Sequence, residues 1–298
     1  MEGTHAKAAR RRPPRSHKPW TAAIAGLVAL TALGGCAAGR TRKLPVTPAS
    51  QNAESESELQ RLFNPPFALA VPEDAVVRIV TPGATCTGTL IEDDLILTAH
   101  HCMVERGAHG EYTKRVLDPE RVKVELGGDY LAWGEVAPRA IIAPPCGTEG
   151  GAGDVAVLVL KRKLVGLSTM TARLDTPPKV GEVVDPMGFG KCALSGDGIK
   201  RRHREGGAIR ALTGETIHLE ASICPGDSGG PIIARGSREV LGVVSMAAMD
   251  ADDKTKNRAV MARIDSYRLV FAHARLVADG LAPNELPPLE CNGASPPK

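Results

Sequence analysis

The sequence predicts an all-β fold that ends in one α-helix, and three observations support this. Short apolar runs follow one another between Gly, Pro and Asp residues, without helical segments between them. Aromatic residues make up only 3% of the chain, so Val, Leu, Ile and Ala must fill the core, which favours Val-rich strands. Helical periodicity appears only near the C-terminus. Strands without intervening helices favour antiparallel barrels or sandwiches over a βαβ sheet.

Composition and charge limit the classes of protein that the chain can belong to. It has 298 residues, of which 43% are hydrophobic and 24% charged, so a disordered or fibrous protein is excluded. The first 35 residues hold six Lys or Arg against one Glu, so the formal charge of +3 leaves −2 for the remainder. A slightly acidic body offers no broad attraction for nucleic acid, and we expect no such partner.

The first 35 residues have the pattern of an export leader. A basic run is followed by an apolar stretch over 21–35 that is short for a membrane span and ends in Leu33-Gly34-Gly35-Cys36. This resembles a bacterial lipoprotein signal, which implies that Cys36 is the first mature residue and carries the lipid. An ordinary secretory leader and an uncleaved anchor through Ala38 remain as alternatives. All three export the body from the bacterial cytosol to the cell envelope, at the outer membrane or in the periplasm, or to the medium.

Three further segments follow the leader. Residues 36–66 are rich in Ser, Glu, Pro, Thr and Asn, which predicts a disordered tether. The body spans 67–289, and 290–298 form a C-terminal tail. Strands are predicted in the body at 76–80, 87–91, 95–98, 122–126, 140–143, 155–160, 217–221, 231–234, 240–245 and 260–264. A helix is predicted over 267–281, with one face formed by Leu269, Val270, His273, Leu276, Val277 and Leu281.

The strongest local signal is the run 224–231, Cys-Pro-Gly-Asp-Ser-Gly-Gly-Pro. Glycines around Ser228 allow a sharp turn and bring N–H groups toward an incoming carbonyl oxygen. His101 could act as the base because it follows an apolar strand. Asp154 could orient the imidazole because it begins the buried run 155–160. Each residue alone has an ordinary structural explanation, but the three together predict nucleophilic catalysis.

His101, Asp154 and Ser228, in this order and with these flanks, resemble the trypsin-like (chymotrypsin-fold) serine proteases. Further segments carry the same resemblance, namely 86–91, 188–190, 242–245 and 260–267. The resemblance implies two antiparallel six-stranded β-barrels with a C-terminal helix. It also implies a monomeric serine endopeptidase that acts on proteins or peptides and needs no cofactor.

The resemblance assigns a role to each matched residue. Ser228 attacks the scissile carbonyl, His101 transfers the proton, and Asp154 orients the imidazole. The N–H groups of Gly226 and Ser228 form the oxyanion hole. His100 stands where the family has a small residue, so we expect its side chain to point away from the triad. A His-His-Cys site is possible from ligand chemistry alone, but we predict no catalytic metal.

Six cysteines remain when Cys36 is set aside, an even number that suits three disulfides in an oxidising compartment. The resemblance maps the first bridge to Cys86 and Cys102. For the other four cysteines three pairings are possible. The family arrangement favours Cys192 with Cys224, which leaves Cys146 with Cys291.

The sequence departs from the family pattern at the usual start of the mature enzyme. Family members are commonly activated when a new Ile or Val amino group inserts beside the Asp before the nucleophile, here Asp227. Residues 67–85 contain no Ile-Val-Gly-Gly start. Asp227 is therefore expected to have another partner, such as an Arg side chain, or else the site is poised differently. In either case we expect the enzyme to be active without amino-terminal cleavage.

The substrate-binding residues also differ from the family pattern. The position of the pocket floor holds Ser222 rather than Asp, Ser245-Met246-Ala247 replaces Ser-Trp-Gly, and Ala259 replaces a Gly on the opposite wall. The added methyl groups should narrow the pocket, which favours small or medium apolar side chains before the cleaved bond. Alternatively, acidic residues of the nearby loop could favour Lys or Arg. These are Asp250, Asp252 and Asp253.

Two other functions fit parts of the sequence. Gly226–Gly230 also matches the Gly-x-Ser-x-Gly pattern of α/β-hydrolases, with Asp265 and His273 in the required order. That esterase needs a helix after the serine, whereas 231–233 has the pattern of a strand. The third possibility is a catalytically silent binding lipoprotein. The basic run 200–204 is interpreted as a solvated, protease-sensitive loop.

Overall fold

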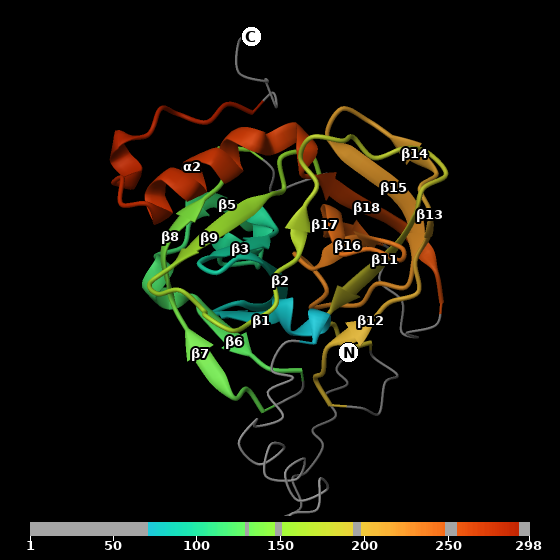
Figure 1. Ribbon diagram of the computed structural model, residues 1–298, viewed down its shortest axis with the longest axis horizontal. Helices are drawn as coiled ribbons and strands as arrows, with labels where there is room; N and C mark the ends of the chain where they lie inside the picture. Colours follow the sequence, from blue (N-terminus) through green and yellow to red (C-terminus); the bar gives the residue numbers. More distant parts are fainter. Residues whose placement is uncertain (1–70, 129–130, 147–150, 193–197, 248–254, 292–298) are drawn as a thin grey trace, which may run out of the picture. The chain divides into compact units, whose positions relative to one another are not determined.

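The computed structural model of the chain describes residues 71–128, 131–146, 151–192, 198–247 and 255–291, all within one unit, Ser57–Lys298 (Figure 1). The leader, Cys36, the tether and the loop with Asp250, Asp252 and Asp253 lie outside these residues. In the described residues the fold is all-β with one α-helix near the C-terminal end, as predicted.

The first barrel is formed by seven strand segments. They are β1 (Val76–Thr81), β2 (Ala84–Glu92), β3 (Leu95–Thr98), β6 (Lys123–Leu126), β7 (Gly134–Val136), β8 (Pro138–Ile142) and β9 (Ala156–Leu160). They pair antiparallel in the order β7-β6-β1-β2-β3-β9-β8. Only Ala137 separates β7 from β8, so one bent run pairs with β6 at one end and with β9 at the other. This run closes a barrel of six runs, as the fold class predicts.

The second barrel closes in a similar way. Its strands are β11 (Val183–Gly188), β12 (Arg202–His203), β13 (Gly207–Ala208), β14 (Ala211–Leu212), β15 (Thr216–Ala221), β16 (Pro231–Ala234), β17 (Glu239–Ala247) and β18 (Asn257–Arg263). The path runs β11-β16-β17-β18-β15-β14, and β13 pairs with β11. The short run 207–212 therefore joins both ends of the sheet. A two-residue strand, β10 (Thr171–Ala172), pairs with β17 in parallel.

Several short elements were not predicted from the sequence. The hairpin of β4 (Val104–Arg106) and β5 (Tyr112–Val116) is largely polar and exposed, so it lacks apolar alternation. Strand β11 contains Asp185 and Pro186, which interrupt the pattern that marks a strand. Single 3-10 turns complete the described fold at η1 (Pro72–Ala75), η2 (His100–Met103), η3 (Pro119–Arg121), η4 (Asp265–Tyr267) and η5 (Pro283–Glu285).

The helix α2 (Arg268–Ala278) is shorter than predicted, and its buried face is rotated. Val270, His273 and Val277 of the predicted face are buried, together with Phe271 and Ala274, whereas the predicted face residue Leu276 is 46% exposed. The helix ends where Gly280 adopts φ 115°, a conformation that favours glycine. Packing on β8 and β9 selects the inward face, which the periodicity alone did not fix.

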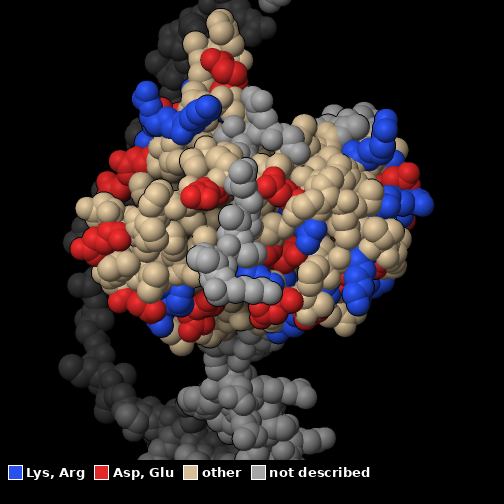
Figure 2. Space-filling view, turned by 90° about the horizontal axis from the view of Figure 1, so that it is seen from above, with Lys and Arg blue, Asp and Glu red and all other residues tan. Residues whose placement is uncertain are grey.

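Two apolar clusters form the core: the larger fills the first barrel and extends under α2 and onto strands of the second barrel, and the smaller lies within the second barrel. The loops that carry the predicted site residues lie where the barrels meet. The N–H of Thr87 on β2 donates a hydrogen bond of 2.8 Å to the carbonyl of Ser228, which precedes β16. On the face seen in Figure 2, acidic and basic side chains are interspersed over the described surface. Among the described residues, no helix combines the length and apolar character needed to cross a membrane.

Candidate active site

His101 and Asp154 meet because the strands beside them are paired. Strand β3 leads into η2, which contains His101, and Asp154 lies just before β9. The antiparallel register aligns Thr98 with Ala156, so the end of one strand lies beside the start of the other. The carboxylate of Asp154 makes two contacts with His101, one from Oδ2 to the ring Nδ1 at 2.7 Å and one from Oδ1 to the backbone N–H at 2.8 Å. Both residues are buried.

A third group reaches the same carboxylate. The hydroxyl of Ser245, at a bulge of β17, donates a hydrogen bond to Oδ2 of Asp154. Sequence analysis placed Ser245 in the wall of the substrate pocket, and the structure adds this contact with Asp154. The carboxylate is thus fixed by three donors, which orients the imidazole of His101 with Nδ1 toward Asp154 and Nε2 away from it.

Ser228 belongs to the loop 222–230 between β15 and β16, and the first barrel holds this loop in place. Besides the bond between Thr87 and the Ser228 carbonyl, the hydroxyl of Thr87 donates to the carbonyl of Gly226 at 2.7 Å. The Cys102 sulfur lies 3.6 Å from His101 Nε2 and 3.8 Å from the Ser228 carbonyl, so both residues contact one sulfur. In the described part of the chain, the Ser228 hydroxyl makes no hydrogen bond to the imidazole.

Glycine is required at position 229. Gly229 has φ 81°, and a Cβ there would lie 2.2 Å from the hydroxyl of Thr98 and 2.4 Å from the carbonyl of Thr87. The loop could not pack against β2 and the end of β3 with a larger residue at this position. The glycine after Ser228 therefore allows the second barrel to approach the strand that leads to His101.

The backbone N–H groups of the loop fall into two sets. The N–H of Asp227 donates to the carbonyl of Cys224, that of Gly229 to Val244, and that of Gly230 to Asp227. Those of Gly226 and Ser228 donate to no backbone carbonyl of the described residues. These two are the pair that the sequence assigned to an oxyanion hole, and two unengaged N–H groups can stabilise a developing negative charge.

Asp227 is fully buried and has the arginine partner that sequence analysis expected, which is Arg204. Arg204 Nε lies 2.8 Å from Oδ2 of Asp227, and its Nη2 donates to Oδ1 at 3.2 Å and to the carbonyl of Gly190. The N–H groups of Gly190 and Cys224 also donate to the carboxylate, at 2.8 Å and 2.9 Å. Burial raises the pKa of the Asp227 carboxyl, and these four groups oppose that effect by favouring the charged form.

Arg204 corrects the interpretation of the basic run 200–204. The side chain of Arg204 is 1% exposed and that of Arg201 12%, so these two are not part of a solvated loop. Charge alone does not distinguish them from neighbouring basic residues. What places them differently is the pairing of β12, the strand between them, with β11, and the sequence does not reveal this pairing.

The predicted pocket residues are brought together in part. Ala247 and Ala259 are directly opposite in the pairing of β17 with β18. Ala259 is buried in the core of the second barrel, and Ala247, which is partly buried, packs against that core. Ser222 is fully buried, whereas Met246 is 47% exposed. The narrow substrate pocket remains a prediction.

Two of the three expected disulfides are formed, Cys86–Cys102 and Cys192–Cys224. The expected bridge between Cys146 and Cys291 is not present, since both are free thiols. The Cys146 sulfur instead lies 3.6 Å from the backbone carbonyl of Cys291. Burial, together with Cys291, raises the pKa of the Cys146 thiol to about 12.

The His100 ring points toward the backbone of Cys146. Its Nδ1 lies 2.6 Å from the carbonyl of Cys146, so Nδ1 carries a proton that is donated to this oxygen. Burial lowers the pKa of His100. Near His101, the potential ligand atoms include the sulfurs of Cys86 and Cys102, but these are bonded to each other.

One aromatic contact at the site was not predicted. Tyr112, at the start of β5, packs edge-on against the ring of His101 with centroids 5.3 Å apart. The guanidinium of Arg106, on the neighbouring strand β4, lies over the Tyr112 ring, 3.7 Å from its centroid. The hairpin β4–β5 therefore covers one side of the imidazole. Its polar sequence gave no signal for this role.

The esterase alternative does not agree with the fold. The segment after Ser228 is strand β16, where an α/β-hydrolase has a helix. Asp265 forms an ion pair with Arg263, and His273 lies on α2, so neither supplies a partner for Ser228.

Comparisons with known proteins agree with the geometry. The sequence model of the family described as Trypsin matches residues 68–270. A putative peptidase of Corynebacterium glutamicum is 24% identical over 69% of this chain and 67% of its own length. Trypsin iota of Drosophila melanogaster and a snake venom serine protease of Crotalus durissus durissus are each 29% identical over 56% of this chain, covering 70% and 69% of their own lengths.

Solved structures show the same fold at lower identity. A Glu endopeptidase in complex with MPD superposes with a TM-score of 0.53 at 18% identity, covering 70% of this chain and 94% of its own. Neuropsin from mouse brain superposes with a TM-score of 0.51 at 16% identity, covering 69% of this chain and 97% of its own.

Proposed function

We propose, for a chain that belongs to the trypsin family of serine proteases and is a serine-type endopeptidase of protein or peptide substrates, that its catalytic residues are His101, Asp154 and Ser228. The observation that carries this proposal is the double contact of Asp154 with the ring and the backbone of His101. A carboxylate bound in this way accepts a hydrogen bond from Nδ1–H and so leaves Nε2 unprotonated, which is the form that a general base needs.

In the proposed reaction each of these three residues has one role. Ser228 Oγ attacks the scissile carbonyl while His101 Nε2 takes its proton, and Asp154 stabilises the resulting imidazolium. The oxyanion is bound by the N–H groups of Gly226 and Ser228. His101 then protonates the leaving amine, and an acyl-enzyme remains on Ser228. Water, deprotonated by His101, hydrolyses this ester and restores the serine.

The Arg204–Asp227 pair supports activity without amino-terminal cleavage. In the family pattern a new amino group neutralises the Asp before the nucleophile, and here the Arg204 guanidinium is in contact with that carboxylate. The N–H groups of Gly226 and Ser228 are then available before any cut. Intact-mass analysis of the chain labelled at Ser228 tests this. We expect the label on chains that keep residues 36–66, and label confined to chains cut within this segment would contradict it.

We further propose a preference for small or medium apolar side chains before the cleaved bond. Ala247 and Ala259 stand opposite each other, and each adds a methyl group where the family has glycine. The substitution Ala259→Gly should widen the pocket and raise kcat/KM for larger side chains in a peptide library. Strong cleavage after Arg by the unmodified enzyme would reverse this assignment.

Export and lipid anchoring at Cys36 complete the proposed function. The leader pattern and the two disulfides fit an oxidising compartment. Metabolic labelling with a palmitate analogue should mark the wild-type protein and leave Cys36→Ala unmarked. Equal labelling of both proteins, or of neither, would contradict the anchor.

Active-site labelling tests the proposed catalytic residues. A fluorophosphonate should label the purified chain, and Ser228→Ala should abolish labelling and lower kcat on the order of 10⁴- to 10⁶-fold. Asp154→Asn should cost roughly 10⁴-fold, because the imidazole loses its tautomer. Absence of labelling in the folded wild-type protein would instead support a silent binding lipoprotein, and turnover of esters without peptides would support an esterase.

A further inference from the structure

The segment 200–204 connects the first barrel to the nucleophile loop through two arginines that contact different barrels. Arg204 reaches Asp227 of the second barrel. Arg201, three residues earlier, donates to the carboxylate of Asp74 at 2.8 Å and to the carbonyl of Val76 at 3.3 Å. Asp74 lies in η1, immediately before the first strand.

The backbone of this segment is held on two sides. Strand β12 contributes only two residues to the ladder with β11, and the N–H of Arg204 donates to the carbonyl of Pro186 at 2.8 Å. On the side of the first barrel, the N–H of Arg201 donates to the carbonyl of Gly128 at 2.7 Å. The side chain of Arg201 adds an ion pair with Asp74 to these backbone contacts, and so links the segment a second time to the start of the first barrel.

The Asp74–Arg201 pair is enclosed enough to act as an anchor. The exposed fractions of the two side chains are 15% and 12%, so water and salt screen this pair less than a surface pair. The neighbouring pair between Glu73 and His203 is longer, at 3.6 Å, and more exposed, at 37% and 65%. Glu73 therefore offers a matched control for Asp74 in the same turn.

We propose that Asp74 is a positioning residue for catalysis, which acts by holding Arg201 so that Arg204 stays paired with Asp227. This inference rests on the proposed function of Ser228. The carboxylate of Asp74, which lies in the segment before β1, then helps to order the nucleophile loop through Arg201 and Arg204. Activity therefore depends on this segment although no amino-terminal cleavage occurs in it.

The main test compares Asp74→Asn with Glu73→Gln in the full-length chain. Asp74→Asn should lower kcat and the amplitude of the acyl-enzyme burst together, at least about fivefold, with KM little changed, because fewer molecules have a competent loop. Glu73→Gln should change both less than about twofold. Circular dichroism at the assay temperature verifies that both variants are folded.

A charge exchange distinguishes positioning from a general packing role. Asp74→Lys places like charges together and should be less active than Asp74→Asn and Glu73→Gln, and adding Arg201→Glu should restore activity toward that of the wild type. Failure of the second substitution to restore any activity would overturn the proposal.

The two proposals fail in different ways. If the folded wild-type chain is not labelled at Ser228, the proposed function is wrong. If the wild type is labelled and Asp74→Asn gives the same burst amplitude, only the positioning role is wrong. An equal loss in Asp74→Asn and Glu73→Gln would also overturn it, since η1 would then act without the Arg201 contact.

Discussion

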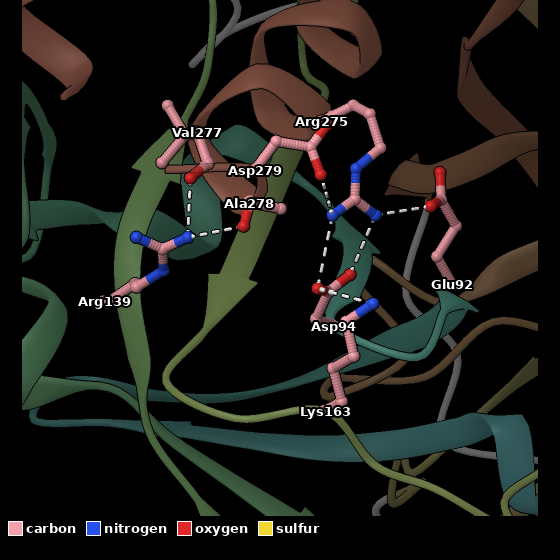
Figure 3. A network of polar contacts seen from close by, with 8 residues as sticks. All are labelled: Glu92, Asp94, Arg139, Lys163, Arg275, Val277, Ala278 and Asp279. Atoms are coloured by element: carbon pink, nitrogen blue, oxygen red, sulfur yellow. Dashed lines mark hydrogen bonds and ion pairs between the residues drawn. The ribbon is translucent and has the colours of Figure 1, made fainter. Parts of the chain in front are cut away.

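Two arginine clusters in this molecule use the same chemistry in different settings. Arg275, on α2, contacts Glu92 at 2.6 Å, Asp94 at 3.0 Å and 3.3 Å, and Asp279 at 3.1 Å (Figure 3). These four residues are called the Arg275 cluster below. It fastens the helix to the turn between β2 and β3, and 30% of the Arg275 side chain is exposed.

The pair of Arg204 and Asp227 is the opposite case. Its side chains are 1% and 0% exposed, and a single carboxylate faces the guanidinium. In the Arg275 cluster water can reach Glu92 and Asp279, which are 48% and 65% exposed, and the buried Asp94 has a second cation, Lys163, at 4.0 Å. Asp227 is not exposed to water. We therefore expect the partly exposed Arg275 cluster to add modest stability. The conformation of the nucleophile loop should depend much more strongly on the enclosed pair of Arg204 and Asp227.

Removing the enclosed arginine should have the largest effect. Arg204→Met leaves the Asp227 carboxylate buried without its cation, which should lower the free energy of unfolding by about 3–5 kcal/mol. Fluorophosphonate labelling of Ser228 should also be lost. Urea unfolding and labelling of the same preparation measure the two effects.

The double substitution Arg204→Met, Asp227→Asn provides the control for that experiment. It removes both charges, so much of the stability should return while labelling stays low. Recovery of full labelling in the double variant would show that the nucleophile loop does not need the ion pair.

Breaking the exposed cluster should cost much less. Arg275→Ala should lower the free energy of unfolding by about 1 kcal/mol, because Glu92 and Asp279 regain water and Asp94 keeps its contact with Lys163. The kcat should not change, since the cluster does not contact the site. A loss of stability as large as that of Arg204→Met would remove the distinction between the two settings.

Salt should separate the same two variants further. The stability difference between wild type and Arg275→Ala should shrink from low salt to 1 M salt, where the Debye length is about 3 Å. The difference for Arg204→Met should stay nearly constant, because ions do not enter that site. Thermal unfolding at both salt concentrations gives the comparison. Parallel behaviour of the two variants would contradict it.

The sequence could predict the residues whose neighbours along the chain reveal their role. His101 and Asp154 each adjoin an apolar strand, and pairing of those strands is enough to bring them together. The glycines around Ser228 likewise report a tight turn locally. For this reason the fold class and the His101–Asp154 contact follow from local pattern together with the family resemblance.

Residues whose role depends on a distant partner were predicted less well. Because residues 67–85 contain no Ile-Val-Gly-Gly start, the sequence indicated that Asp227 needs another partner. It did not distinguish Arg204 from the other basic residues of 200–204. Tyr112 gave no signal, because its contact with His101 depends on how the β4–β5 hairpin folds back. Pairing Cys146 with Cys291 by elimination was wrong, since both are free thiols and the pairing rested only on how many cysteines remained.

His100 is a buried group that can gain a proton as the pH falls. Of the changes discussed, substituting it should have the smallest effect on stability. Its Nδ1 proton is donated to the Cys146 carbonyl, and its buried Nε2 has no hydrogen-bond partner among the described residues. Burial lowers the pKa of His100 below the ordinary 6.5, although Asp154 opposes this and His101 adds to it.

The sign of the pH dependence follows from this shift. Because the folded pKa lies below the unfolded one, the unfolded chain binds more protons between the two values. The contribution of His100 to stability is therefore present above pH 6.5 and is lost as the pH falls from 6.5 through the folded pKa. His100→Asn keeps a donor without this titration, so its urea midpoint should fall less than that of the wild type between pH 7 and pH 5. His273, whose pKa is also lowered by burial, remains in both proteins and contributes equally. Parallel midpoints over this range would show that the imidazole of His100 is not held in its neutral form.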